Sequence, residues 1–164
     1  QFLTSDDDGI NWVKIGDATA SDKYIFKTAE KISIEGATKS RMVHDVDFLL
    51  SNSMSFGRPY IMRTSGCIHD GWLVLSDYGS SLDQDYLYLV LGSRIVFRQF
   101  DRLAAGSTVR NMNIDLASRV AIPVPPLGQQ PEIAAQLEAT YSATTLLESV
   151  YQQKLAALEA LKKL

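Results

Sequence analysis

Three prolines within four residues divide this chain into two parts of different composition. They stand in Pro123-Val-Pro-Pro-Leu-Gly128, and neither a helix nor a central strand continues through them, because proline lacks the amide proton that both structures use. We therefore predict an extended linker here. Residues 129–164 contain no glycine, and their one proline, Pro131, falls in a first helical turn, where a missing amide is tolerated. The chain thus divides into a domain over residues 1–128 and a helical region over residues 129–164.

The region after the linker is predicted to be one long helix with a single apolar stripe. It is rich in Ala, Leu, Gln, Glu and Lys, which favour helices. Apolar residues recur at intervals of three or four residues, as in a coiled coil. The exception is Thr144, a polar residue at a position where the pattern calls for an apolar one. The predicted helix interface consists of Ile133, Leu137, Tyr141, Leu147, Tyr151, Leu155, Leu158 and Leu161. A partner helix has to cover it, supplied by the remainder of a longer chain, by a second copy or by another subunit.

Before the linker, the pattern mixes short strands with helical spacing. Runs of β-favouring residues bounded by Gly, Ser, Asn and Asp predict strands of a curved sheet at Trp12–Ile15, Phe48–Leu50, Tyr60–Met62, Trp72–Ser76 and Val120–Ile122. Residues 83–105 follow helical spacing instead, with a break or kink expected at Gly92-Ser93. The predicted fold class is α+β: a curved β-sheet domain with short helices, followed by one long coiled-coil α-helix.

Bulk properties limit the class of protein. With 164 residues, of which 46% are hydrophobic, the chain can bury one core. Its longest apolar runs, such as Leu87–Leu91, are too short to cross a bilayer, and Gln1–Asp8 lacks the pattern of a secretion signal. Cys67 is the only cysteine, which fits a reducing compartment. We expect a cytoplasmic protein with no membrane partner.

The sequence contains no pattern typical of a catalytic site. Gly66-Cys-Ile-His-Asp-Gly71 has the glycine spacing of a phosphate-binding loop, but Trp72 and Leu73 stand where Lys and Ser or Thr are required. His44-Asp45 and His69-Asp70 are the only His-Asp pairs, and carboxylates that stabilise turns explain them better than acid-base chemistry does. Spacings typical of metal sites or of hydrolase nucleophiles are absent. We expect neither enzymatic activity nor a metal site.

Four ordered segments carry a resemblance to a known family. They are Asp47–Pro59, Ser65–Trp72, Ala105–Asn113, and Ile122–Gln130 with Ile133. In this order and spacing they resemble the target-recognition domain and conserved helix of the specificity subunit of type I restriction-modification systems, over roughly Trp12–Leu164. Gln129 departs from the family, which usually has Glu there. A full member has two such domains and two helices, whereas this chain has one of each.

The resemblance implies a division of labour between subunits. A specificity subunit reads a bipartite sequence on double-stranded DNA, one half for each recognition domain, and its helices set the spacing and dock the methyltransferase subunits. A second recognition half, or a second copy of this chain, would pair through the long helix. S-adenosylmethionine would bind to the methyltransferase subunits and ATP would be used by the restriction subunit, so no cofactor is expected in this chain.

Side chains suited to reading DNA gather in polar stretches and along one helix face. Arg, Lys, Asn, Gln and Ser contact base edges, and further cations contact phosphates. The net charge is −3, but residues 10–120 carry slightly more positive than negative side chains, so a basic surface is compatible with the composition. Arg94, Arg98 and Arg102 have the spacing of one helix face. The predicted DNA-binding residues are Lys39, Ser40, Arg41, Asn52, Ser53, Ser55, Arg58, Arg63, Arg94, Arg98, Thr108, Arg110 and Asn111.

Structural alternatives exist for these residues and for the function. Ser and Asn in Ser51–Ser55 also stabilise turns, Arg58 can pair with an Asp, and a row of arginines is common on helices that face solvent. The rival function is a protein-interaction module, an α+β domain with a coiled-coil handle and no DNA binding. The acidic net charge favours this alternative.

Overall fold

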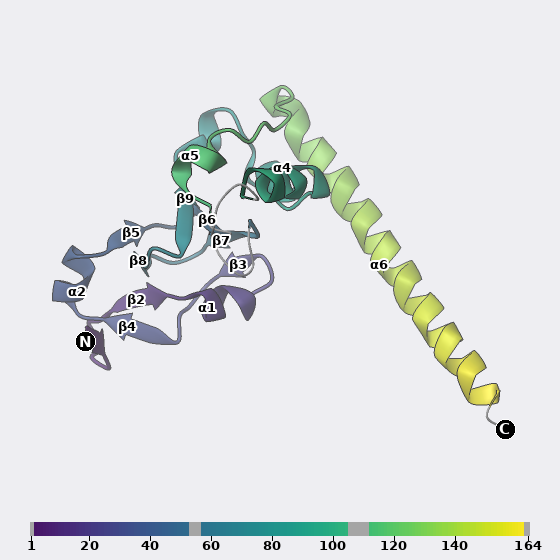
Figure 1. Cartoon of the computed structure of the whole chain (residues 1–164), viewed down its shortest axis with the longest axis horizontal. Helices are drawn as coiled ribbons and strands as arrows, with labels where there is room; N and C mark the ends of the chain where they lie inside the picture. The colour runs from purple at the N-terminus through teal and green to yellow at the C-terminus, as the bar shows by residue number, and fades with distance from the viewer. Residues whose placement is uncertain (1, 53–56, 105–111, 163–164) are drawn as a thin grey trace.

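The computed structural model describes residues 2–52, 57–104 and 112–162, and it confirms the predicted α+β class with a long terminal helix (Figure 1). The strands are β1 (Leu3–Thr4), β2 (Ile10–Val13), β3 (Tyr24–Ile25), β4 (Glu30–Ile32), β5 (Arg41–Val43), β6 (Phe48–Ser51), β7 (Pro59–Met62), β8 (Gly66–Ile68) and β9 (Trp72–Leu75). The helices are α1 (Ile15–Thr19), α2 (Ile34–Thr38), α3 (Gln84–Leu91), α4 (Arg94–Ala104), α5 (Ile114–Ala117) and α6 (Gln130–Leu161), with the 3₁₀ turns η1 (Tyr78–Ser80) and η2 (Leu127–Gln129).

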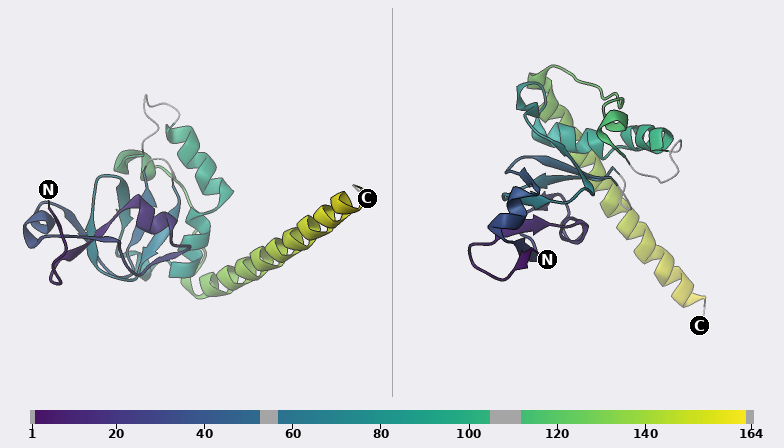
Figure 2. Two further views of the ribbon diagram at one scale, coloured as in Figure 1. Left: turned by 90° about the horizontal axis from the view of Figure 1, so that it is seen from below. Right: turned by 60° about the vertical axis from the view of Figure 1, so that its left-hand side comes forward.

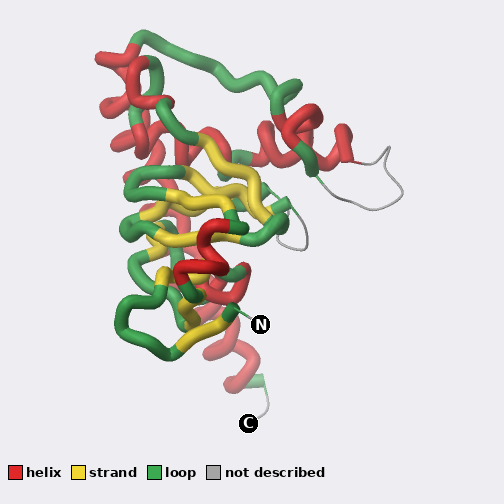
Figure 3. The backbone as a smooth tube through the Cα atoms, turned by 90° about the vertical axis from the view of Figure 1, so that its left-hand side faces the viewer, coloured by secondary structure: helices red, strands yellow, loops and turns green. Residues whose placement is uncertain are grey.

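The described strands form two mixed sheets. The first sheet has the order β1-β4-β2-β8-β5, and the second has the order β3-β7-β6-β9. β2 runs parallel to β8 and β3 runs parallel to β7, while the other pairs are antiparallel. The strands occupy the middle of the domain (Figure 3).

The second sheet is buried on both faces, because its side chains alternate between two cores with the period of a β-strand. Leu49 and Tyr60 pack with Val13 of the first sheet in one core. Phe48 and Ile61, their neighbours along the strands, pack in the other core with residues of α3, α4 and α6. The domain therefore has three layers: the first sheet, the second sheet and the helices.

The predicted helix over residues 83–105 is two helices. Asp83 caps α3, because its carboxylate accepts hydrogen bonds from the amides of Asp85 and Tyr86. α3 ends at Leu91, Gly92 follows as its C-cap, and α4 begins at Arg94. The expected break at Gly92-Ser93 is thus confirmed.

Two strand predictions were wrong in whole or in part. Val120–Ile122 is not a strand, because the side chain of Gln99 takes the place of a neighbouring strand: it donates to the carbonyl of Ala121 and accepts from its amide. The strand expected at Trp12–Ile15 ends at Val13, and Ile15 begins α1.

Gln130 fixes the start of the long helix to the domain. Its side chain is fully buried, and its amide nitrogen donates to the carbonyls of Ser81 and Pro125 at 2.9 and 2.8 Å. Its amide oxygen accepts from the backbone N–H of Asp83 at 2.7 Å. The neighbouring Gln129 is exposed and makes no capping hydrogen bond with its side chain. One buried amide thus joins the linker, the start of α3 and the start of α6.

Beyond this anchor, α6 leaves the domain. The helix has 32 residues, which corresponds to about 50 Å at its usual rise. Figure 2 shows it extending away from the domain in both views, and every described residue from 135 to 162 is exposed. Among the described residues, no helix is both long and apolar enough to cross a membrane.

Candidate nucleic-acid interface

The strands run between two ends of the domain. The pairing of residues in neighbouring strands shows which loops lie together at each end. Arg41 lies opposite Ile68 and Ser51 lies opposite Trp72. What we call the loop end therefore contains Lys39–Arg41, Asn52, Gly57–Arg58 and His69–Gly71. What we call the helix end contains His44–Asp47, Arg63, Tyr78 and Asp83, where α6 begins.

At the loop end, hydrogen bonds join segments that are far apart in the sequence. The side-chain amide of Asn52 donates to the carbonyl of Asp70 at 2.6 Å, and its backbone N–H donates to the carbonyl of Gly71 at 3.1 Å. The amide of Met112 donates to the carbonyl of Asn52 at 3.1 Å. Three segments are therefore neighbours: Asn52 after β6, the turn at Asp70–Gly71 before β9, and Met112.

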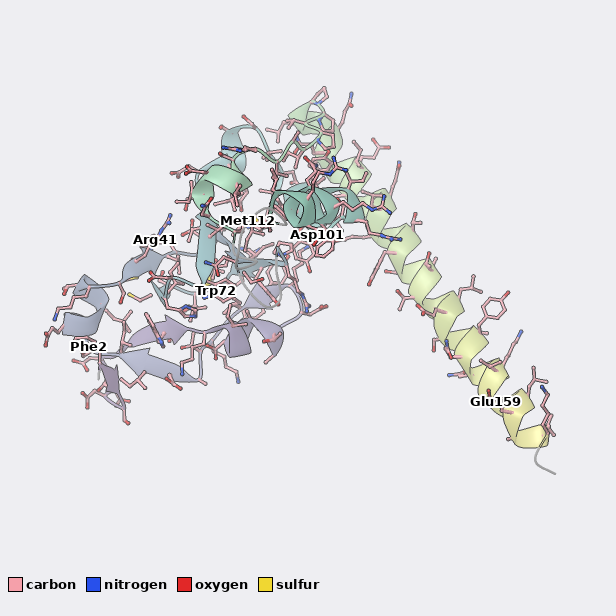
Figure 4. The ribbon with its side chains drawn as sticks, viewed as in Figure 1. Phe2, Arg41, Trp72, Asp101, Met112 and Glu159 are labelled. Atoms are coloured by element: carbon pink, nitrogen blue, oxygen red, sulfur yellow. The ribbon has the colours of Figure 1, made fainter. Side chains whose placement is uncertain are left out.

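Lys39–Arg41 joins this group through a shared concavity. The concavity, of about 400 Å³, is lined by Trp12, Lys39, Ser40, Arg41, Ile68, His69, Asp70 and Trp72. Lys39 pairs with Glu35 at 2.8 Å, and the Ser40 hydroxyl donates to the carbonyl of Gly36. Arg41 is exposed and, among the described residues, makes no side-chain hydrogen bond or ion pair; it projects from β5 (Figure 4). Arg41 is thus the cation in this concavity that is available to a ligand.

The arginines of α4 form a second basic feature. Arg94, Arg98 and Arg102 are exposed and lie on the face opposite the buried Val96 and Phe100, as the helical repeat requires. None of the three makes an ion pair within the described part of the chain. These side chains form a row that could follow a phosphate backbone.

α4 packs against the segment that precedes β7, at the loop end. Gly57 has a φ of +74°, and a Cβ placed on it would stand 2.7 Å from Cδ2 of Phe100. Glycine therefore allows both the left-handed backbone and the close approach of the helix.

Arg58 and Arg63 are engaged within the protein. Arg58 lies 3.8 Å from the carboxylate of Asp22, and its guanidinium lies over the ring of Tyr60. Arg63 donates to the side chain of Gln84 at 2.7 Å, at the helix end. The structure therefore does not bring Arg63 together with the other predicted DNA-binding residues.

The remaining predicted positions divide into two groups. Ser53, Ser55, Thr108, Arg110 and Asn111 lie outside the described residues. In the predicted helix interface, Ile133 is half-buried and packs against the core of the domain. The other members, Leu137, Tyr141, Leu147, Tyr151, Leu155, Leu158 and Leu161, are all exposed.

His69 lines the concavity, although the sequence did not mark it as a DNA contact. Its Nδ1 accepts a hydrogen bond from the amide of Gly71 at 2.8 Å, so the neutral ring carries its proton on Nε2. Burial lowers the pKa of His69 below its usual value, because desolvation disfavours the charged ring. The feature of the sequence that could have indicated this arrangement is Gly71, two residues after His69. No group of three or more His, Cys, Asp or Glu residues within the described chain is placed to hold a metal.

Solved structures share this arrangement of sheets and long helix. No protein-family model matches the sequence. A chain from a structure of the assembly and conformational transition of the type I restriction-modification system aligns with a TM-score of 0.67 and 20% identity, and it covers 98% of this chain. The HsdS subunit from Thermoanaerobacter tengcongensis aligns with a TM-score of 0.65 and 17% identity, over 84% of this chain.

The chain has the fold of these proteins. It spans only 38% and 37% of their respective lengths. The shared HsdS-like fold therefore corresponds to a part of each longer protein.

Proposed function

We propose that this chain reads one half of a bipartite DNA site for a type I restriction-modification complex. The observation that carries the proposal is the convergence at the loop end. This end brings together Lys39–Arg41, Asn52 and Met112, which are far apart in the sequence. The HsdS-like fold supports the same function.

In this proposal, separate parts of the chain have separate tasks. Side chains of the loop end contact base edges in the groove, and the arginines of α4 contact phosphates. α6 leaves from the opposite end of the domain, where it sets the spacing to a second recognition half and docks methyltransferase subunits. The methyltransferase subunits bind S-adenosylmethionine and the restriction subunit uses ATP, while this chain contributes neither cofactor nor catalysis.

A protein-interaction module without DNA binding is the alternative. The helix end favours it, because Asp45, Asp47, Asp77 and Asp83 line a concavity of about 840 Å³ there. These four carboxylates outnumber Arg41, the one Lys or Arg residue in the described part of the chain that also lines this concavity, so the surface repels phosphates. Both functions agree with the structure of this end, since methyltransferase subunits are also protein partners. The two proposals differ at the loop end, so the test belongs there.

Replacing Arg41 with Ala is expected to weaken binding of target DNA by about 5- to 150-fold, the factor that corresponds to the loss of a base contact worth about 1 to 3 kcal/mol. The measurement is a titration of labelled target duplex with the complex assembled with methyltransferase subunits. Arg119→Ala is the matched control, because it removes the same charge from an exposed position in the turn after α5, which does not line the concavity of the loop end. Equal affinities for the two variants and the unchanged chain would remove Arg41 from the interface, and an unchanged complex that binds no DNA would favour the protein-interaction module.

A further inference from the structure

The concavity at the loop end combines hydrogen-bond donors, an acceptor and aromatic walls. Arg41 supplies a guanidinium with no partner among the described residues, and His69 supplies the N–H of Nε2. The carboxylate of Asp70 is an acceptor, and its residue is exposed. Trp12, whose ring centroid lies 6.1 Å from that of His69, forms one wall. This mixture is not that of a simple phosphate site, because the carboxylate would repel an anion.

The turn that carries His69 and Asp70 is held rigidly. Gly71 donates to Nδ1 of His69, and a Cβ on Gly71 would clash with Cε1 of the same ring. Asn52 holds the other side of the turn through the carbonyls of Asp70 and Gly71. The imidazole therefore has one orientation, with Nδ1 turned to the backbone and Nε2 left for a ligand. Such preorganisation lowers the entropy lost on binding.

A base edge in the major groove offers the complementary chemistry. Guanine presents acceptors and its cytosine partner presents an amino donor, while an A·T pair presents an adenine acceptor and donor beside a thymine acceptor. An N–H donor next to a carboxylate acceptor matches such an edge, and a neighbouring guanidinium can reach a further acceptor or the adjacent phosphate.

We propose that His69 is a specificity-determining residue, which reads one base pair of the target together with Arg41 and Asp70. Nε2–H of His69 donates to an acceptor on the base edge, and Asp70 accepts from the amino group of the same pair. This inference rests on the proposed function and adds to it the place where one base pair is read. The second histidine-aspartate pair, His44-Asp45, lies at the opposite end of the β5-β8 ladder, since Val43 pairs with Gly66 and Arg41 pairs with Ile68.

Two substitutions of His69 separate base reading from turn formation. His69→Asn keeps a short side chain whose oxygen can accept from the amide of Gly71, but it removes the group at the position of Nε2. His69→Gln reaches that position with an amide donor, but it places no acceptor at the position of Nδ1. A reading role thus predicts that Gln preserves function better than Asn, whereas a role in the turn alone predicts the reverse order.

The experiment selects from a library of randomised DNA duplexes with the complex assembled with methyltransferase subunits. We expect His69→Asn to lower discrimination at one base pair of one half-site on the order of 10-fold, with the other positions unchanged. His69→Gln should retain most of this discrimination, and Asp70→Asn should alter the preference at the same base pair. His44→Asn and Asp45→Asn are the matched controls, and both should select the sequence of the unchanged chain. Thermal melting of each variant confirms that the fold is kept.

Three results would overturn the proposal. The first is a His69→Asn complex that selects the unchanged sequence, and the second is a Gln variant that discriminates less well than the Asn variant. The third is a loss of affinity spread evenly over all base pairs, which would make the pocket a backbone contact. An unchanged complex that selects no sequence at all would instead overturn the proposed function, and with it this inference.

Discussion

Replacing Gln130 with Ala is expected to lower the free energy of unfolding by about 3 kcal/mol, because three hydrogen bonds of its fully buried side chain are lost, at about 1 kcal/mol each. The groups left unpaired are the carbonyls of Ser81 and Pro125 and the N–H of Asp83. For a chain of this size the melting temperature should fall by roughly 10 °C. Differential scanning calorimetry measures both quantities.

Gln129→Ala is the matched control for this prediction. The two glutamines are adjacent, but Gln129 is exposed and its side chain makes no capping hydrogen bond. Its replacement should change the melting temperature little, as is usual for exposed positions. Equal effects of the two substitutions would show that the buried hydrogen bonds of Gln130 do not fix the helix to the domain.

Changing both Leu147 and Leu155 to Asp is expected to abolish pairing through α6. Their side chains are 55% and 53% exposed, far from the core of the domain, so they gain burial only from a partner helix. Two carboxylates in a helical seam would be desolvated without partners, which opposes pairing strongly. Light scattering on a sizing column should give the mass of two chains for the unchanged protein and of one chain for the variant.

The double variant Ser149→Asp and Ala156→Asp is the control for the seam. It adds the same charge to the same part of α6, but both positions lie on the opposite face, since about 3.6 residues make one turn. This control should pair as the unchanged protein does. If the control and the seam variant paired equally well, the stripe would not be the interface, and if the unchanged protein ran as one chain, self-pairing through α6 would be wrong.

The parts of the fold that the sequence predicted are those governed by strong local preferences. The prolines before Gly128 marked the end of the first region, and the glycine-free segment after Gly128 forms α6. Gly92 divided two helices at the expected place. β1 and β3 have two residues each, so no alternation of polar and apolar residues is long enough to reveal them. The strand expected at Val120–Ile122 was wrong because a side chain, that of Gln99, satisfies the backbone there.

The candidate site was predicted in part, because its assembly depends on strand register. Polar composition identified Lys39–Arg41 and Asn52, but only the pairing of β5 with β8 and of β6 with β9 places them at one end. The same criterion selected Arg63, whose guanidinium binds Gln84 at the other end. The sequence also treated the two His-Asp pairs alike, whereas the structure places only His69-Asp70 in the concavity of the loop end.

Exchange of the domain provides the most direct test of the proposed function. Residues 1–128 would be replaced by an unrelated recognition domain while α6 is kept, and methylated sites would then be mapped across the genome of cells that produce the assembled complex. We expect one half of the methylated sequence to change, while the other half and the spacing between the halves remain the same. Methylation of the same sites after the exchange would show that residues 1–128 do not read the DNA sequence.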